Sequence, residues 1–179
     1  MLKVNHKQFF WLNFVCFQLV WFISVYLGNQ GIAYLCMLLV VHFYFSPSRL
    51  HDLKTVFLIA PIGMIADSLL SKAGIFVFAD GSLLPIWLAF LWAYFALTLN
   101  HGLSWLKRMP IYLQAIIGAV SGPLSYYAGY KMGGVALPEG IIKSLFVLAV
   151  IWAALLPVYL IVLSYLDRSN HGVIQNKQK

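Results

Sequence analysis

The chain has 179 residues, of which 62% are hydrophobic and only 9% are charged, whereas soluble domains carry about 25% charged residues. A soluble fold of this length could not bury so much apolar surface, so the composition predicts an all-α helix bundle that crosses a lipid bilayer several times, as one transmembrane domain over residues 1–179. The net charge of +7 does not indicate nucleic-acid binding, because the basic residues are dispersed among short loops instead of lying together on one face.

Six apolar stretches approach the length of about 20 residues that crosses a bilayer as a helix. In chain order, the predicted transmembrane helices are residues 9–27, 31–46, 55–71, 85–101, 110–128 and 144–166. Turn-forming or proline-containing segments separate them, starting with GNQG at 28–31. The first stretch is too long for the apolar region of a signal peptide and no cleavage site follows it, so we expect it to be retained. Residues 167–179 are predicted to form a mobile tail.

The distribution of lysine and arginine between alternate loops predicts the orientation of the chain. If the N-terminus is cytoplasmic, the inner segments contain Lys3, Lys7, Arg49, Lys54, Lys107, Arg108, Arg168, Lys177 and Lys179. The outer segments then contain only Lys72, Lys131 and Lys143. Because short cytoplasmic loops collect basic residues, we expect six transmembrane helices with both termini and the tail in the cytoplasm.

The third predicted helix contains an aspartate, Asp67, among apolar residues. An ionisable side chain inside a span is expensive and indicates a functional site with a nearby partner. The helical rise of about 1.5 Å per residue places Asp67 in the outer third of the hydrocarbon core. Its candidate partners are Lys72, Lys131, Lys143, Ser125 and Tyr126. The alternative is that Asp67 only ties the third helix to the fifth by hydrogen bonds.

The fourth and fifth predicted helices carry two further patterns. Trp87, Leu91, Tyr94, Thr98 and His101 recur at helical spacing on one face of the fourth. That face could line a pocket, or it could turn toward the bundle and bond to neighbouring helices. In the fifth, Gly118 and Gly122 form a G-x-x-x-G motif that allows close helix packing, within the chain or between chains. Pro123 follows and is expected to bend or break the helix.

The polar residues fall into two clusters at different depths. The outer cluster contains Asp67, Trp87, Ser125, Tyr126 and Tyr127, and together with Tyr94 these residues form the predicted ligand-binding site. The inner cluster contains His42, His51, Asp52, Thr98, Asn100 and His101. Its three histidines could in principle bind zinc together with Asp52, but no tight motif such as H-x-x-x-H occurs. We therefore predict no metal site, no catalytic residue and no cofactor.

Three segments, GMIADSLLSKAGIFVF, PIWLAFLWAYFALTLNHGLSWL and GAVSGPLSYYAG, together resemble an uncharacterised family of small bacterial inner-membrane proteins, one of the domain-of-unknown-function families. The resemblance covers about residues 9–166 and implies a multi-pass protein of the bacterial inner (cytoplasmic) membrane. It carries no established activity and no catalytic residue. Members of the family are often encoded near lipid-modifying enzymes, which hints at lipid metabolism.

A fainter similarity is to the six-helix substrate-binding subunits of energy-coupling-factor transporters and to the rod-shape membrane proteins. It rests on length, six spans and the pattern G-x-x-x-D-x-L-L in the third span. Those subunits bind a small molecule near the outer face. The present chain lacks their docking motif for energising subunits.

Three functions are compatible with these features. The first is binding or transport of a small or amphipathic ligand, which Asp67 would orient while the aromatic residues stack on it. The second is a non-catalytic accessory role in a lipid-modifying or envelope complex. The third is a lipid-modifying membrane enzyme, although the sequence favours a protein that is not an enzyme. The expected partners are membrane lipids, a small-molecule or lipid ligand, and a partner subunit or a second copy of the chain, with no nucleic acid.

Overall fold

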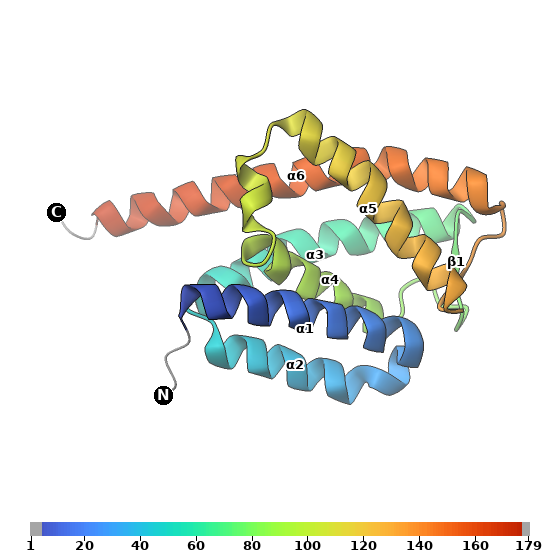
Figure 1. Cartoon of the computed structure of the whole chain (residues 1–179), viewed down its shortest axis with the longest axis horizontal. Helices are drawn as coiled ribbons and strands as arrows, with labels where there is room; N and C mark the ends of the chain where they lie inside the picture. Colours follow the sequence, from blue (N-terminus) through green and yellow to red (C-terminus); the bar gives the residue numbers. More distant parts are fainter. Residues whose placement is uncertain (1–4, 177–179) are drawn as a thin grey trace.

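The computed structural model describes residues 5–176, with side chains described as far as Arg168 apart from His6. These residues form six α-helices, two 3-10 helices and two very short strands (Figure 1). In chain order they are α1 (His6–Leu27), η1 (Gly28–Gly31), α2 (Ile32–Phe45), α3 (Arg49–Lys72), β1 (Val77–Phe78), α4 (Ile86–Asn100), η2 (Ser104–Arg108), α5 (Ile111–Lys131), β2 (Val135–Ala136) and α6 (Ile141–Asn176). The predicted all-α fold is confirmed.

Two helix ends differ clearly from the prediction. Helix α3 begins at Arg49 instead of residue 55, because its polar first turn carries Asp52, an acid near the helix N-terminus that is also hydrogen-bonded to other helices. Helix α6 continues past residue 166 to Asn176. The predicted tail is therefore helical as far as Asn176, and residues 177–179 lie outside the described part of the chain. Whether the tail is mobile stays a prediction.

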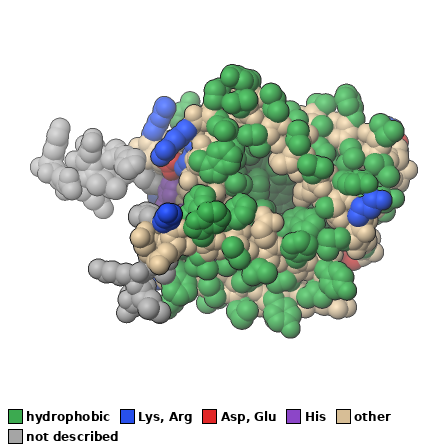
Figure 2. Space-filling view, in the orientation of Figure 1, with side chains coloured by type: hydrophobic (Ala, Val, Ile, Leu, Met, Phe, Trp, Pro, Cys, Tyr) green, Lys and Arg blue, Asp and Glu red, His purple; other side chains and the backbone are tan. Residues whose placement is uncertain are grey.

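The surface of the helices is that of a membrane protein. Within the described residues, three segments are long and apolar enough to cross a membrane, namely Lys7–Phe45, Arg49–Lys72 and Ile141–Arg168, and α4 is a shorter apolar helix. The first of these segments contains both α1 and α2, which fold back on each other at η1 (Figure 1). Large apolar side chains such as Phe57, Ile142 and Phe146 are 70% or more exposed, and hydrophobic side chains cover much of the face in Figure 2.

The loops at one end of the bundle are joined to each other. Strand β1, between α3 and α4, pairs antiparallel with β2, between α5 and α6. Ser144, at the start of α6, donates its hydroxyl to the carbonyl of Ile75 at 2.6 Å. These strands were not predicted, because two residues are too few to show an alternating pattern. The pairing joins the α3–α4 loop to the α5–α6 loop.

The G-x-x-x-G motif of α5 packs against α6 of the same chain. A Cβ atom on Gly118 would lie 2.3 Å from the carbonyl oxygen of Trp152, and one on Gly122 would lie 2.1 Å from the Trp152 ring. The predicted close packing is therefore present, and the motif is used within the chain. Helix α5 is continuous through the buried Pro123, so the helix does not break there, and the alternative prediction of a bend stays a prediction. Neighbouring helices allow a proline inside a span without breaking it.

Another glycine, Gly63, which was not identified from the sequence, allows close packing between α3 and α4. A Cβ atom on Gly63 of α3 would lie 2.3 Å from the ring of Trp92 on α4. The rings of Trp92 and Trp152 are stacked, with centroids 5.7 Å apart and planes inclined by 11°. Gly63 and Gly122 thus make room for an indole pair in the centre of the bundle.

Replacing Gly63 with alanine is expected to lower the free energy of unfolding by about 1–3 kcal/mol, because the new methyl group overlaps a ring that is already held between helices. Unfolding in mixed micelles of detergent and dodecyl sulfate measures the change. The matched control is Gly129→Ala, where the nearest atom to a new Cβ is 3.7 Å away and alanine favours the helix by about 1 kcal/mol. Equal effects of the two substitutions would contradict the prediction.

Candidate ligand-binding cavity and the Asp52 network

A cavity of about 380 Å³ lies between α1 and α5, with α4 behind it, and Figure 2 shows it as a hollow in the middle of the face, ringed by hydrophobic side chains. This volume is within the range of about 300–1,000 Å³ that is usual for ligand pockets. Its aromatic lining residues are Phe17, Trp21, Phe22, Phe78, Trp87, Trp92, Phe95, Tyr126 and Trp152. Its lining residues with polar side chains, the indoles and Tyr126 aside, are Gln18, Asp67, Ser121 and Ser125.

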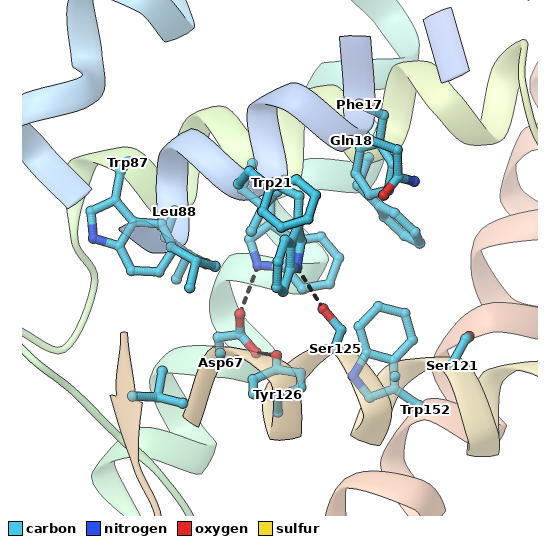
Figure 3. Close-up of a pocket in the computed structure, with 18 of the residues that line it drawn as sticks. Phe17, Gln18, Trp21, Asp67, Trp87, Leu88, Ser121, Ser125, Tyr126 and Trp152 are labelled. Atoms are coloured by element: carbon cyan, nitrogen blue, oxygen red, sulfur yellow. Dashed lines mark hydrogen bonds between the residues drawn. The ribbon is translucent and has the colours of Figure 1, made fainter. Parts of the chain in front are cut away.

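The carboxylate of Asp67 lies at this cavity and is 2% exposed. Trp92 donates its Nε1 hydrogen to Oδ2 at 2.8 Å, and the hydroxyl of Tyr126 donates to Oδ1 (Figure 3). The predicted partner Tyr126 is therefore confirmed, whereas Trp92 was not foreseen. Within the described residues no lysine, arginine or histidine forms an ion pair with Asp67.

Two other predicted residues, Ser125 and Trp87, also line the cavity. The hydroxyl of Ser125 accepts a hydrogen bond from Nε1 of Trp21 at 2.8 Å, which links α5 to α1 across the cavity (Figure 3). Trp87 is buried and packs edge-on against Phe78, with ring centroids 5.5 Å apart. Four of the six predicted residues, Asp67, Trp87, Ser125 and Tyr126, are thus brought together at one cavity.

The remaining two predicted residues lie elsewhere. Tyr94 donates its hydroxyl to the carbonyl of Leu38 on α2 at 2.7 Å, and it does not line the cavity. It follows Trp87 by seven positions, so it lies about 10 Å further along the helix axis. Tyr127 packs against Tyr130, and Lys131 lies 5.4 Å from the centre of the Tyr127 ring.

The opposite end of the bundle contains a buried hydrogen-bond network centred on Asp52, which is 0% exposed. Its Oδ1 accepts from Asn100 Nδ2 at 2.8 Å and lies 2.7 Å from His101 Nε2. Its Oδ2 accepts from the hydroxyl of Ser46 and lies 3.2 Å from His42 Nε2. An ionised carboxylate offers about four acceptor positions, so these four groups saturate Asp52.

The same network extends to the last helix. Nε2 of His51 lies 3.2 Å from Oδ1 of Asn100 and 3.0 Å from Oδ1 of Asp167 on α6. Lys107 of η2 forms an ion pair with the other oxygen of Asp167 at 2.8 Å. The predicted inner cluster is therefore a contiguous network, except that Thr98 bonds to the carbonyl of Tyr94 in its own helix.

The ligand atoms of His42, Asp52 and His101 lie within 4.8 Å of one another, which is a spacing a metal ion could bridge. The neighbouring Asn13 argues against that role. Its Oδ1 accepts from the backbone N–H of Gly102 at 3.1 Å, so its Nδ2 faces His42 Nδ1 at 3.4 Å. An amide nitrogen only donates, so Nδ1 accepts and Nε2 of the neutral ring carries the hydrogen that bonds to Asp52. A metal would require that same Nε2 to be unprotonated.

Several contributing residues were missed from the sequence. Aromatic residues are common in membrane proteins, and no spacing pattern distinguished three of the cavity tryptophans, Trp21, Trp92 and Trp152, from the others. Asn13 and Gln18 did carry a signal, because each is a polar side chain inside the first apolar stretch. One lies at the Asp52 network and the other at the cavity.

Comparison with known proteins adds a family but no function. A family model described as "Protein of unknown function (DUF2878)" matches residues 10–158. No curated protein matches the chain, and no solved structure does. The resemblance to an uncharacterised domain-of-unknown-function family is confirmed, while the similarity to energy-coupling-factor subunits and rod-shape proteins stays an expectation.

Proposed function

Since the chain belongs to the family described as Protein of unknown function (DUF2878), its activity has to be inferred from its own residues, and we propose that it binds a membrane-resident amphipathic ligand in the cavity between α1 and α5. The proposal includes six passes through the bacterial inner membrane, with both termini in the cytoplasm.

The arrangement of the helices supports this topology. Helix α1 begins and α6 ends at the same end of the bundle (Figure 1), as an even number of passes requires. That end carries Lys107 and Arg168, which suits a cytoplasmic face. Helices α2 and α4 have 14 and 15 residues, or about 21–22 Å of helix, so the bilayer has to thin locally or polar ends have to reach the interface.

The position of the cavity mouth carries the functional proposal. The hollow in Figure 2 lies on the side of the bundle, between the long axes of α1 and α5, and not at an end of the helices. In a bilayer, the side of a helix bundle faces lipid. Phe22, which lines the cavity, is itself 53% exposed on this surface. A ligand that enters here arrives from the membrane and must be soluble in it.

The lining indicates that this ligand is amphipathic. Most of the wall is aromatic or aliphatic, and the area an apolar chain buries there stabilises the complex. Asp67 and Ser125 present polar atoms at the same cavity. Such a combination, a largely apolar cavity with a few convergent polar groups, is typical of small-molecule sites.

The proposal is tested by filling the cavity. Ser121 lines the cavity. We expect the wild type to retain a lipid or metabolite in native mass spectrometry, and we expect Ser121→Phe to abolish that retention. Val120→Phe is the matched control, because Val120 is the preceding residue of α5 and is 55% exposed. A wild-type protein without any retained small molecule, or a Ser121→Phe variant that still retains it, would refute the proposal.

The accessory role predicts a different spectrum. A partner protein bound elsewhere on the helices would stay associated when the cavity is filled. Retention of a protein partner by Ser121→Phe, without any small molecule in the wild type, would favour the accessory role over ligand binding.

A further inference from the structure

Asp67 is a buried acid that forms no ion pair with any residue that the structure describes. It is 2% exposed and lies within a bundle whose surroundings are apolar. Its two partners, Trp92 and Tyr126, are neutral donors. Burying an ionised carboxylate without an opposite charge is costly, so a positive charge placed beside Asp67 would be strongly favoured.

The walls around Asp67 have the chemistry that binds organic cations. Trp21, Trp87, Trp92 and Trp152 all line the cavity, and Figure 3 shows the labelled rings of Trp21, Trp87 and Trp152 around it. The negative faces of indole rings attract ammonium groups, with about 0.5–1 kcal/mol at exposed sites and about 2 kcal/mol where the cation is desolvated. Four indoles and one carboxylate line the same cavity, and these are the groups that bind an ammonium group.

The same lining is unsuitable for an anion. Among the residues that line the cavity there is no lysine, arginine or histidine. The three lysines predicted as partners of Asp67 lie elsewhere. Lys72 is exposed, Lys143 is paired with Glu139 at 2.5 Å, and Lys131 lies over the ring of Tyr127. A phosphate or carboxylate inside the cavity would face Asp67 without compensation.

We infer that the ligand carries an ammonium group, which binds between the carboxylate of Asp67 and the surrounding indole rings, with its apolar chain directed to the mouth between α1 and α5. This inference rests on the proposed ligand-binding function and names its ligand class. The ammonium group can belong to a long-chain amine or to the head group of an aminophospholipid, whose phosphate then stays outside the cavity.

Three probes with the same hydrocarbon chain, and with a positive, a neutral or a negative head group, test which charge the cavity prefers. Hexadecylamine, hexadecanol and hexadecanoate are offered to the purified protein in nanodiscs of phosphatidylglycerol, and native mass spectrometry measures what is retained. We expect hexadecylamine to be retained roughly tenfold more strongly than hexadecanol, a difference of about 1.4 kcal/mol, and hexadecanoate least. The lipid source is tested by comparing phosphatidylethanolamine with its N-acetylated form, which lacks the ammonium charge.

Asp67→Asn is the variant that isolates the charge. Asparagine can accept from Trp92 through Oδ1 and donate to the hydroxyl of Tyr126, which can reverse its role, so both hydrogen bonds survive. The preference for hexadecylamine over hexadecanol is expected to disappear in this variant. If it cannot be purified, Trp87→Leu keeps Asp67 and removes one indole, and the preference is expected to fall.

The outcomes separate the inference from the proposed function. If hexadecanol is retained as well as hexadecylamine, or if Asp67→Asn keeps the preference, the ammonium inference fails while ligand binding stands. If none of the probes and no native lipid is retained, the proposed function fails with it. Retention of hexadecylamine but not of phosphatidylethanolamine would support a free amine as the ligand.

Discussion

Replacing Asp52 with alanine is expected to lower the free energy of unfolding by about 3–5 kcal/mol, as is typical when one partner of a buried ionic network is removed. The carboxylate accepts from or contacts four groups, on His42, Ser46, Asn100 and His101. Alanine would leave the buried His42 and Ser46 and the half-buried Asn100 and His101 without their acceptor. Each unsatisfied buried group costs about 1–3 kcal/mol, although the costs are not additive.

Asp52→Asn refines this expectation. Asparagine keeps one acceptor oxygen, but its amide nitrogen must face one of the donors. Because Asn13 fixes the hydrogen on Nε2 of His42, that ring cannot turn into an acceptor without losing its contact with Asn13. We therefore expect the free energy of unfolding of Asp52→Asn to lie between that of Asp52→Ala and that of the wild type, and clearly below the wild-type value.

Unfolding in mixed micelles of detergent and dodecyl sulfate measures both variants. Glu139→Gln serves as the control, because Glu139 is an exposed carboxylate of the β2–α6 loop and is paired with Lys143 in the first turn of α6. An exposed pair of this kind contributes little. Equal stability of Asp52→Ala and Glu139→Gln would show that the Asp52 network does not hold the helices together.

The helices and their order could be predicted because the bilayer imposes one strong constraint. A span must be apolar over about 20 residues, and the search for apolar stretches approaching that length located all six α-helices. A polar first turn is not detected by its hydropathy, so the predicted start of α3 was too late. The first turn of α3 contains Asp52, which stabilises the turn although it is polar. Tyr126 was one of five candidate partners of Asp67, because the two residues lie at a similar depth along their helices, and the contact between them is present.

The cavity itself could not be predicted, because depth does not fix which helices are neighbours. The bond between Trp21 and Ser125 joins residues 104 positions apart, and no pattern in the sequence places α1 beside α5. Similarly, the sequence does not show that Gly63 faces Trp92 while Gly122 faces Trp152. Those pairings depend on the rotation of each helix about its axis, which side-chain packing decides.

Replacing Gly118 with leucine is expected to cost about 3 kcal/mol or more, at the upper end of what overpacking causes. The new Cβ atom would lie 2.3 Å from the carbonyl oxygen of Trp152 and 3.0 Å from Cβ of Leu156. The obstructing atom is backbone, so a rotamer change on α6 cannot relieve the overlap and the two helices have to separate. Val120→Leu on the exposed side of α5 is the control, with an expected change within about 0.5 kcal/mol.

Separation of α5 from α6 should also disturb the cavity. Trp152 stacks on Trp92, and Trp92 donates to Asp67, so a displaced Trp152 removes the support of the acid. Gly118→Leu is therefore expected to lose the retained ligand even in membranes where it stays folded, whereas Val120→Leu keeps it. If Gly118→Leu instead changes only the oligomeric state, with stability and ligand retention intact, the G-x-x-x-G motif joins copies of the chain and the α5–α6 contact is not its role.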